Sequence, residues 1–508
     1  MTLSAIIFLP LVIGLLCAFA PRRQVGWIAA AGSVAVLVYA IVLLAGYPSS
    51  GSGMKWAVDE VWIRELGIHY SLGVDGLNLF LIVLTALLWV PATIAAALRE
   101  WDSPRVFFFN MALAETAVLG AFCAQDVALF VFFFDLMLVP FYFLIGAFGG
   151  RRRVQATTKF VIYTLVGSLL MLAAAVALGV LSTPPGGQIS FRISDLARHT
   201  LSSGSQEWIF LLFAAAFLVK MPAFPLHGWM PDAYRATPIP VLVLLSAVLS
   251  KVGAYGFLRI VLPLMPDASQ HFQELMIVIA VVSILYGSVL AFSQDDARLV
   301  IGYSSVAQLG FITLGIFSLD PKGAQGALFQ MVNHGIVTAA LFLILAVLAA
   351  RAGGSDLLSR MGGLAMRAPV LAALFLITAL ATLAMPGSAN FVGELYILFG
   401  ILDSKLAYGI VASAGVVLAA VYMIRMYQRA MHNRAGPGVE SRELSRWDFG
   451  LIAPLVAVII ALGVYPQFVL DRSGASTVSV LHPETSVISA GGWTYYGPVD
   501  EPSPKATP

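Results

Sequence analysis

Residues 220–259 read KMPAFPLHGWMPDAYRATPIPVLVLLSAVLSKVGAYGFLR, a stretch that places two lysines in long apolar surroundings. Lys220 ends one apolar run directly before Pro222, and Lys251 lies in the middle of the next run. An ionised side chain inside a membrane span costs about 2.5–3.5 kcal/mol, so such residues are rare and by default functional. An ammonium this far from an interface must find a carboxylate or water, or release its proton. Both lysines therefore indicate a transport site within a membrane.

The composition of the whole chain agrees with this interpretation. Of its 508 residues, 59% are hydrophobic and 11% are charged, and the mean hydropathy is +0.90, whereas a soluble domain has about 25% charged residues. A net charge of +2 without a long basic block excludes nucleic acid as a partner. Cys17 and Cys123 lie in separate apolar runs and form neither a CxxC motif nor a metal cluster. The first run lacks the features of a signal peptide, so we expect a retained helix.

Apolar runs separated by proline, glycine or charged residues predict an all-α polytopic membrane protein with about fourteen transmembrane helices. Lysine and arginine concentrate in alternate loops, as in Arg22, Arg151 and Arg425, and such loops are cytoplasmic. This pattern places both termini outside the cytoplasm, which an even number of spans allows. The expected spans are residues 2–20, 25–46, 76–98, 105–123, 126–149, 157–181, 207–226, 238–263, 272–293, 298–318, 324–350, 368–399, 405–430 and 447–470.

Four further ionisable side chains fall inside these spans: Asp135, Glu115, His334 and Glu394. By the same cost argument they are candidate functional residues. Glu115 and His334 each have an equally good alternative interpretation, which is a buried polar group that is hydrogen-bonded to a neighbouring helix.

Two spans are interrupted by a Met-Pro dipeptide, at Met221-Pro222 and at Met385-Pro386. Proline removes a backbone donor and frees a carbonyl, which lipid does not tolerate unless the gap lines protein or water. Paired interruptions of this kind are typical of inverted-repeat transporters. The two dipeptides lie about five spans apart, and an odd number of helices inverts the second copy relative to the first.

The expected organisation has four parts. Residues 1–104 form three helices with an external loop at 47–75, residues 105–264 form the first five-helix repeat, residues 265–430 form the inverted second repeat, and residues 431–508 form the last helix and an external tail. The 47–75 loop and the tail from about 471 contain glycine, serine and proline with mixed charge. We expect both to be ordinary solvated connections.

The stretch 220–259 closely resembles the signature of the antiporter-like subunits of respiratory complex I and of multisubunit sodium/proton antiporters. Further segments resemble the M-type subunits of bacterial NADH:quinone oxidoreductase, which are equivalent to mitochondrial NADH dehydrogenase subunit 4. Glu394 favours this group, because the corresponding position in the antiporter homologue and in the other pumping subunits is usually lysine. The resemblance covers nearly the whole chain apart from the tail, and the further segments are YSLGVDGLNLFLIVLT (70–85), FFFDLMLVPFYFLIG (132–146), KFVIYTLVGSLLML (159–172), MGGLAMRAPVLAALFLI (361–377) and MPGSANFVGELYILFG (385–400).

The resemblance implies a role for each buried group. Lys220 is the central proton carrier of the first half, and Asp135 is the acidic partner that modulates it. Lys251 and His334 relay protons along the midplane of the membrane, and Glu394 passes them to the outside. The resemblance also assigns His227, in PLHGW, to the cytoplasmic mouth.

The sequence departs from the family pattern at two of these positions. The acidic partner is usually glutamate, whereas Asp135 is one methylene shorter, so we expect a longer or water-bridged pair with Lys220. The family commonly has histidine where this chain has Gln308. Glutamine cannot titrate, so the relay at this position would run through solvent.

No segment matches GxxxxGK[ST], GxGxxG, HExxH or CxxC, and we expect no cofactor in this chain. The resemblance implies that partner subunits hold NADH, FMN, iron–sulfur clusters and quinone, and that other membrane-arm subunits, homologous antiporter-like chains among them, and lipids are the partners. The predicted function is proton translocation driven by NADH oxidation. A subunit of a sodium/proton antiporter or of a related membrane-bound hydrogenase, and a structural subunit that only spaces its neighbours, are the alternatives.

Overall fold

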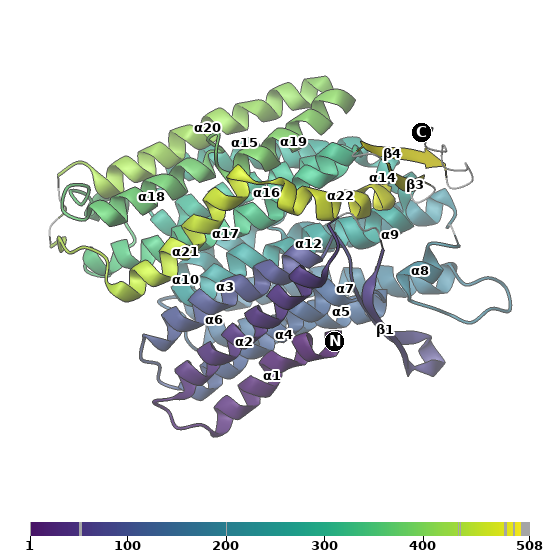
Figure 1. The fold of residues 1–508 in the computed structure, drawn as a ribbon, viewed down its shortest axis with the longest axis horizontal. Helices are drawn as coiled ribbons and strands as arrows, with labels where there is room; N and C mark the ends of the chain where they lie inside the picture. Colours follow the sequence, from purple (N-terminus) through teal and green to yellow (C-terminus); the bar gives the residue numbers. More distant parts are fainter. Residues whose placement is uncertain are drawn as a thin grey trace.

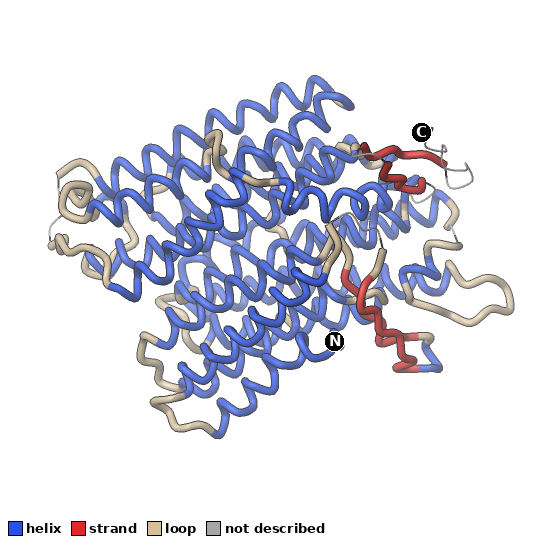
Figure 2. Tube along the Cα trace, in the orientation of Figure 1, coloured by secondary structure: helices blue, strands red, loops and turns tan. Residues whose placement is uncertain are grey.

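The computed structural model describes residues 2–49, 53–199, 201–434, 436, 438–481, 485–490 and 493–498. Most of these residues are helical (Figures 1 and 2). The helices are α1 (Leu3–Phe19), α2 (Val25–Gly46), α3 (Leu79–Ala97), α4 (Pro104–Cys123), α5 (Val127–Leu136), α6 (Leu138–Gly146), α7 (Arg153–Leu181), α8 (Ile193–Leu196), α9 (Ser203–Lys220), α10 (Met230–Ala236), α11 (Ile239–Leu244), α12 (Ser250–Gly256), α13 (Leu262–Leu264), α14 (Pro266–His271), α15 (Gln273–Ser293), α16 (Ala297–Phe317), α17 (Pro321–Arg351), α18 (Pro369–Thr382), α19 (Ala389–Ser404), α20 (Leu406–Met431), α21 (Arg446–Val464) and α22 (Gln467–Leu481).

Short 3₁₀ and π turns join some of these helices. The 3₁₀ turns are η1 (Arg64–Leu66), η2 (Leu226–Trp229) and η5 (Leu358–Arg360), and the π-helical turns are η3 (Leu245–Leu249) and η4 (Phe257–Val261).

Several helices begin where a polar side chain caps the first turn. Asp126 accepts a hydrogen bond from the backbone of Leu129 at the start of α5, and Asp320 does the same for α17. Ser445 and Asp448 form a reciprocal capping box at the start of α21. Such caps satisfy backbone donors that have no partner inside the helix. They fix the ends of segments whose apolar composition already favours membrane insertion.

Among the described residues, eleven helical segments are long and apolar enough to cross a membrane. The chain is therefore an all-α polytopic membrane protein, but three of the fourteen expected spans do not meet this measure. The first is α1, which has 17 residues. The second is α9, whose start is polar, and the third is the 368–399 segment, which is divided into α18 and α19. Helix α1 is one residue short of the length required, whereas a polar start shortens the apolar part of α9 and a helix break divides the third segment.

The long helices run side by side, with the N-terminal helices at one side and the helices of the second half at the other (Figure 1). On the first side, α1 packs on α4 and α2 on α3, and on the other side α15 packs on α20. The 239–264 segment and α16 are wholly buried between them. Helix α17 contacts α3, α11 and α19. This one long helix thus joins segments from both halves of the sequence.

A β-hairpin replaces most of the expected irregular connection at 47–75. Strand β1 (Lys55–Ile63) pairs antiparallel with β2 (Ile68–Val74), and Leu72 of β2 forms a bridge with Ala124. The residues of β2 from Ser71 to Val74 are buried. Most of the described segment is thus exposed or half-buried, but it forms a regular hairpin whose end at Ser71–Val74 packs into the bundle, which the prediction of an ordinary solvated connection missed.

The C-terminal segment also departs from its prediction. The tail expected from about residue 471 instead continues α22 to Leu481, and Ser473, Ser476 and Thr477 on this helix are buried. Strands β3 (Thr485–Ala490) and β4 (Trp493–Pro498) then pair antiparallel, near the same end of the bundle as the first hairpin (Figure 2). The remainder of the predicted tail lies outside the described residues. Serine and threonine lower the hydropathy of α22 without preventing its burial, because they hydrogen-bond to their own helix.

Candidate functional site

Lys220 is the last residue of α9 because Pro222 cannot continue the helix. The carbonyls that the break frees find partners within the protein: Leu218 O accepts from the backbone of Ala223 at 3.0 Å, and Val219 O accepts from the indole of Trp229 at 2.9 Å. A membrane protein must satisfy such groups internally. The break therefore presents the lysine at a defined helix end without leaving unpaired backbone in lipid.

The Lys220 side chain is 4% exposed. Its Nζ lies 3.5 Å from the carbonyl oxygen of Phe134 and 4.3 Å from the centroid of the Phe134 ring. Asp135 is the next residue, but no ion pair joins its carboxylate to Lys220, and its Oδ1 has no hydrogen-bond partner among the described residues. The lysine thus meets the π face and backbone of Phe134, while the acidic group stays nearby without direct contact.

Lys251 lies in α12 between the two π-helical turns η3 and η4, and it is fully buried. Its Nζ is 2.9 Å from Nδ1 of His334 on α17, and it also donates to Ser246 O at 3.1 Å and to the Ser250 hydroxyl at 3.3 Å. π turns are rare and occur often at functional sites. Gly335 permits this approach, because a Cβ there would lie 3.0 Å from the carbonyl of Ala247.

Glu394 lies on α19, which follows the helix break at Met385-Pro386. Its Oε1 accepts from Gln308 of α16 at 2.8 Å and lies 3.5 Å from the amide of Gln330 on α17. Gln330 also donates to Gln308 at 2.8 Å. Gly393 lets the two helices meet, because a Cβ there would lie 2.4 Å from the Gln330 side chain. Three helices thus hold one buried carboxylate in a network of amides.

The helix break between α18 and α19 is also surrounded by polar side chains of the protein. Gly387 and Ala384 adopt positive φ angles of 92° and 56° between α18 and α19. The side chain of Asn333 on α17 donates to the carbonyl of Ala389 at 2.8 Å. Both polar atoms of the buried Asn390 amide have no hydrogen-bond partner among the described residues, which is typical of groups that water satisfies.

The remaining predicted residues lie apart from the Lys251–His334 and Gln308–Glu394 contacts. His227 is on η2, where its ring packs near Phe224 and Tyr286 and its Nδ1 has no partner among the described residues. Glu115 faces a small gap between α1, α2, α3 and α4, where it lies with Trp89 and Ser33. The structure therefore brings Lys251 together with His334 and Gln308 together with Glu394, but it does not bring Glu115 to either pair.

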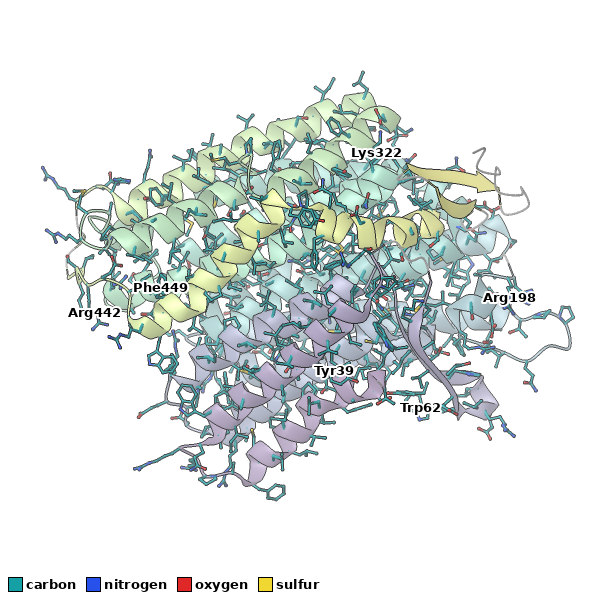
Figure 3. All side chains as sticks on the ribbon, viewed as in Figure 1. Tyr39, Trp62, Arg198, Lys322, Arg442 and Phe449 are labelled. Atoms are coloured by element: carbon teal, nitrogen blue, oxygen red, sulfur yellow. The ribbon has the colours of Figure 1, made fainter. Side chains whose placement is uncertain are left out.

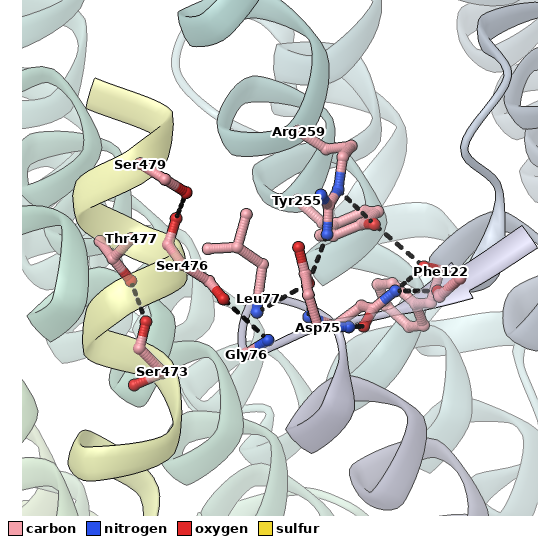
Figure 4. Close-up of polar contacts among 12 residues, drawn as sticks. Asp75, Gly76, Leu77, Phe122, Tyr255, Arg259, Ser473, Ser476, Thr477 and Ser479 are labelled. Atoms are coloured by element: carbon pink, nitrogen blue, oxygen red, sulfur yellow. Dashed lines mark hydrogen bonds and ion pairs between the residues drawn. The ribbon is translucent and has the colours of Figure 1, made fainter. Parts of the chain in front are cut away.

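One buried ion pair was not among the predicted site residues. Arg259 Nη2 lies 2.5 Å from Asp75 Oδ1, and Arg259 Nε donates to the Tyr255 hydroxyl, which donates to Phe122 O (Figure 4). Ser476 of α22 accepts from the backbone of Gly76 beside this pair.

Helical spacing in the sequence could have pointed to the residues that the prediction missed. Lys251, Tyr255 and Arg259 follow one another at intervals of four, which places them on one face of a helix. In the same way, Gln330 lies four residues before His334, on the same face of α17.

No group of histidine, cysteine, aspartate and glutamate within the described residues could hold a metal ion. What the arrangement offers is a set of buried groups that accept and donate protons: two lysines, a histidine and carboxylates, spread over both halves of the bundle.

Comparisons with known proteins match this arrangement to one family. Residues 124–420 match the family described as NADH:quinone oxidoreductase/Mrp antiporter, TM. NADH-quinone oxidoreductase subunit M of Rhodobacter capsulatus is 36% identical, covering 94% of this chain and 96% of the relative, and that of Escherichia coli K12 is 38% identical, covering 93% and 96%. The chain belongs to the NADH-quinone oxidoreductase subunit M family. It is therefore an antiporter-like, proton-translocating subunit of the membrane arm of complex I.

Solved structures show the same fold. A chain of respiratory complex I from Thermus thermophilus with bound NADH superposes with a TM-score of 0.86 at 31% identity, covering 94% of this chain and all of that chain. A chain of the Mrp complex from Dietzia superposes with a TM-score of 0.83 at 22% identity, covering 95% and 98%. The second likeness shows a shared fold alone. The sodium/proton antiporter is therefore a more distant relative than subunit M.

Proposed function

We propose that this subunit carries protons along one buried route from Lys220 through Lys251 and His334 to Glu394. The single observation that carries the proposal is the 2.9 Å contact between Lys251 and His334. Lys251 belongs to the expected first repeat, and His334 belongs to the expected second repeat. A nitrogen-to-nitrogen contact within hydrogen-bond distance lets a proton pass from one half to the other.

The inward end of the route begins at the first break. His227 at the cytoplasmic mouth admits protons, and Lys220 receives them. An opposite charge favours the ammonium form, so approach of Asp135 holds the proton on Lys220. When Asp135 withdraws, the buried ammonium loses its counter-charge and releases the proton toward Lys251. The open position of Asp135, near Lys220 but not paired with it, supports this switching role.

The outward end of the route lies at the second break. Glu394 accepts the proton and passes it to the outside, and the amides of Gln308 and Gln330 orient the carboxylate. Neither amide titrates, so water completes the path at this end. The unpaired polar atoms of Asn390, Glu394 and Gln330 support a hydrated path there.

We further propose fourteen crossings with both termini outside the cytoplasm of a bacterial plasma membrane. The two five-helix repeats are then residues 105–264 and 265–430. Charged residues assigned to opposite faces support this topology, because Arg442 lies at one end of the bundle and Arg198 and Lys322 lie at the other (Figure 3). The excess of arginine on the Arg442 face indicates the cytoplasmic side.

The energy for this transport comes from outside the chain. Moving one charge against 100 mV costs about 2.3 kcal/mol. Partner subunits holding NADH, FMN, iron–sulfur clusters and quinone would supply this energy, and a conformational or electrostatic signal from the quinone site would reach the Asp135–Lys220 pair. Homologous antiporter-like subunits are the expected neighbours in the membrane arm.

Inside-out membrane vesicles test the proposal. NADH oxidation and acidification of the lumen are measured together for the unaltered chain, for Lys220→Ala and for the exposed control Lys322→Ala, after complex assembly has been checked. We expect Lys220→Ala to move fewer protons per NADH oxidised in an assembled complex, and Lys322→Ala to keep the unaltered ratio. Unchanged pumping per electron in Lys220→Ala would mean that this half-channel is idle, as the spacer alternative requires. Loss of only a sodium-driven proton exchange would favour the antiporter alternative.

A further inference from the structure

A basic cavity of about 590 Å³ opens where α7 begins and α10 lies beside it. Three arginines and one carboxylate give the cavity its charge. It is lined by Arg151, Arg152, Gln155, Ala156, Asp232 and Arg235. The cavity lies on the loop face that we propose to be cytoplasmic, and no step of the proton route uses it.

The walls of this cavity are fixed by backbone and ionic contacts. The backbone of Gly150 donates to Ala236 O at 2.8 Å, which ties the arginine loop to the end of α10. Arg152 has a φ of +62° and directly precedes α7. The cavity is therefore part of a defined loop geometry that joins two helices.

The charges around the cavity do not balance. Asp232 is paired with Lys159 at 2.8 Å, and Arg235 is paired with Asp296 at 3.1 Å. Arg151 and Arg152 have no carboxylate partner among the described residues. Two positive charges thus remain beside the cavity, and the planar guanidinium group binds phosphate oxygens in pairs.

Helix α7 also carries an exposed apolar stripe, which begins at Val154, two residues after Arg152, and runs into the membrane region. Val154, Ile162, Leu165 and Leu169 follow each other at intervals of three, four or eight residues, and they are 71%, 56%, 45% and 57% exposed. A free phosphate would use only the arginines. A ligand with a phosphate group and long hydrocarbon chains uses the arginines and the stripe together.

We propose that this cavity binds the phosphate group of an anionic phospholipid. Arg151 and Arg152 hold the phosphate, and the acyl chains lie along the exposed stripe of α7. Basic pockets between membrane helices on the cytoplasmic side bind such headgroups. The site is separate from Lys220, Lys251, His334 and Glu394, so the proposal does not depend on the proton route.

Photolabelling of the intact purified complex tests this site. The probe is phosphatidylglycerol with a photoreactive diazirine in one acyl chain, and labelled peptides are identified by mass spectrometry. The variants are Arg151→Gln/Arg152→Gln and the matched control Arg22→Gln/Arg23→Gln, a pair of exposed adjacent arginines on the same face. We expect the unaltered complex and the control to be labelled within residues 154–172. The Arg151/Arg152 variant should need a roughly 30-fold higher probe concentration for equal labelling, because two arginines near the membrane surface contribute additively.

Four labelling results would each overturn the proposal. They are equal labelling in the Arg151/Arg152 variant, absence of labelling within residues 154–172, equal labelling by the matched phosphatidylcholine probe, and suppression of the labelling by inorganic phosphate, which would indicate a site for free phosphate. Loss of neighbouring subunits from the Arg151/Arg152 variant would also overturn it, because the arginines would then form a protein contact. Labelling is read independently of NADH oxidation, so a failure here leaves the proton route unaffected.

Discussion

Lys251 Nζ lies 2.9 Å from His334 Nδ1, and this contact joins a helix of the first half of the chain to a helix of the second half. Both side chains are almost completely buried. At this distance the ammonium can donate to a neutral imidazole, so the pair shares one proton position between two titratable groups.

His334→Gln is expected to lower proton pumping while leaving the fold intact. Glutamine still accepts a hydrogen bond from Lys251, but it cannot take up the proton. We expect the rate of proton transfer through this subunit to fall by roughly 100-fold or more, the lower end of what loss of a positioned proton-transfer group costs. The control is His271→Gln at the exposed end of α14. Equal acidification in His334→Gln and the unaltered chain would show that His334 is only a hydrogen-bonded core residue.

Asp135→Asn is expected to lower proton pumping, whereas Asp135→Glu is expected to maintain or raise it. Asparagine removes the charge that holds the proton on Lys220, so acidification should decrease. Glutamate restores the usual residue of the family and adds one methylene, for which the open apolar groove beside Asp135 has room. We expect pumping in Asp135→Glu to equal or exceed that of the unaltered chain. Similar losses in both variants would contradict the switching role and indicate a packing role.

Glu394→Gln separates titration from packing at the outward end. The variant keeps the size of the side chain and its contacts with Gln308, but it cannot carry a proton. We expect Glu394→Gln to lose proton pumping by this subunit and Glu394→Asp to retain part of it, with assembly unchanged in both. Glu274→Gln, which alters an exposed carboxylate bonded to Tyr408, serves as the control. Normal pumping in Glu394→Gln would remove this residue from the route.

We expect the buried Asp75–Arg259 ion pair to affect the stability of the folded protein, because removing one partner leaves an unpaired buried charge. Arg259→Gln leaves the Asp75 charge buried without its partner, which destabilises a protein by about 3–5 kcal/mol. The double variant Asp75→Asn/Arg259→Gln removes both charges and should recover most of that loss. Thermal unfolding of the purified complex measures the effect, and Arg192→Gln, which breaks partly exposed pairs with Asp59 and Asp195, should change it little. Equal losses in the single and double variants would argue against the ion pair as the cause.

The sequence predicts the buried ionisable residues well because the cost of burying a charge is a local property. Lys220, Lys251, His334 and Glu394 are all buried, and both Met-Pro dipeptides lie at helix breaks. Their partners are less predictable. Phe134 meets Lys220 and Gln330 meets Glu394 across 86 and 64 residues of sequence, and only the packing of the helices determines these contacts.

Hydropathy fails where polar residues are buried by tertiary contacts. Helix α22 carries Ser473, Ser476 and Thr477 on a buried face, so its composition resembles that of a solvated tail. The β1–β2 hairpin is not predicted from the sequence for a related reason. Asp59 and Glu60 make β1 look like a loop, whereas pairing with β2 and burial of Leu72 fix it as a strand.

The central claim is that Lys220 and Glu394 lie on one proton route rather than on two. The most direct test measures protons moved per NADH oxidised in Lys220→Ala, in Glu394→Gln and in the variant with both changes, each in an assembled complex. A single route predicts the same deficit in protons per NADH for both single variants and no further deficit in the double variant, because blocking a route twice has no added effect. A double variant whose deficit equals the sum of the two single deficits would contradict the account.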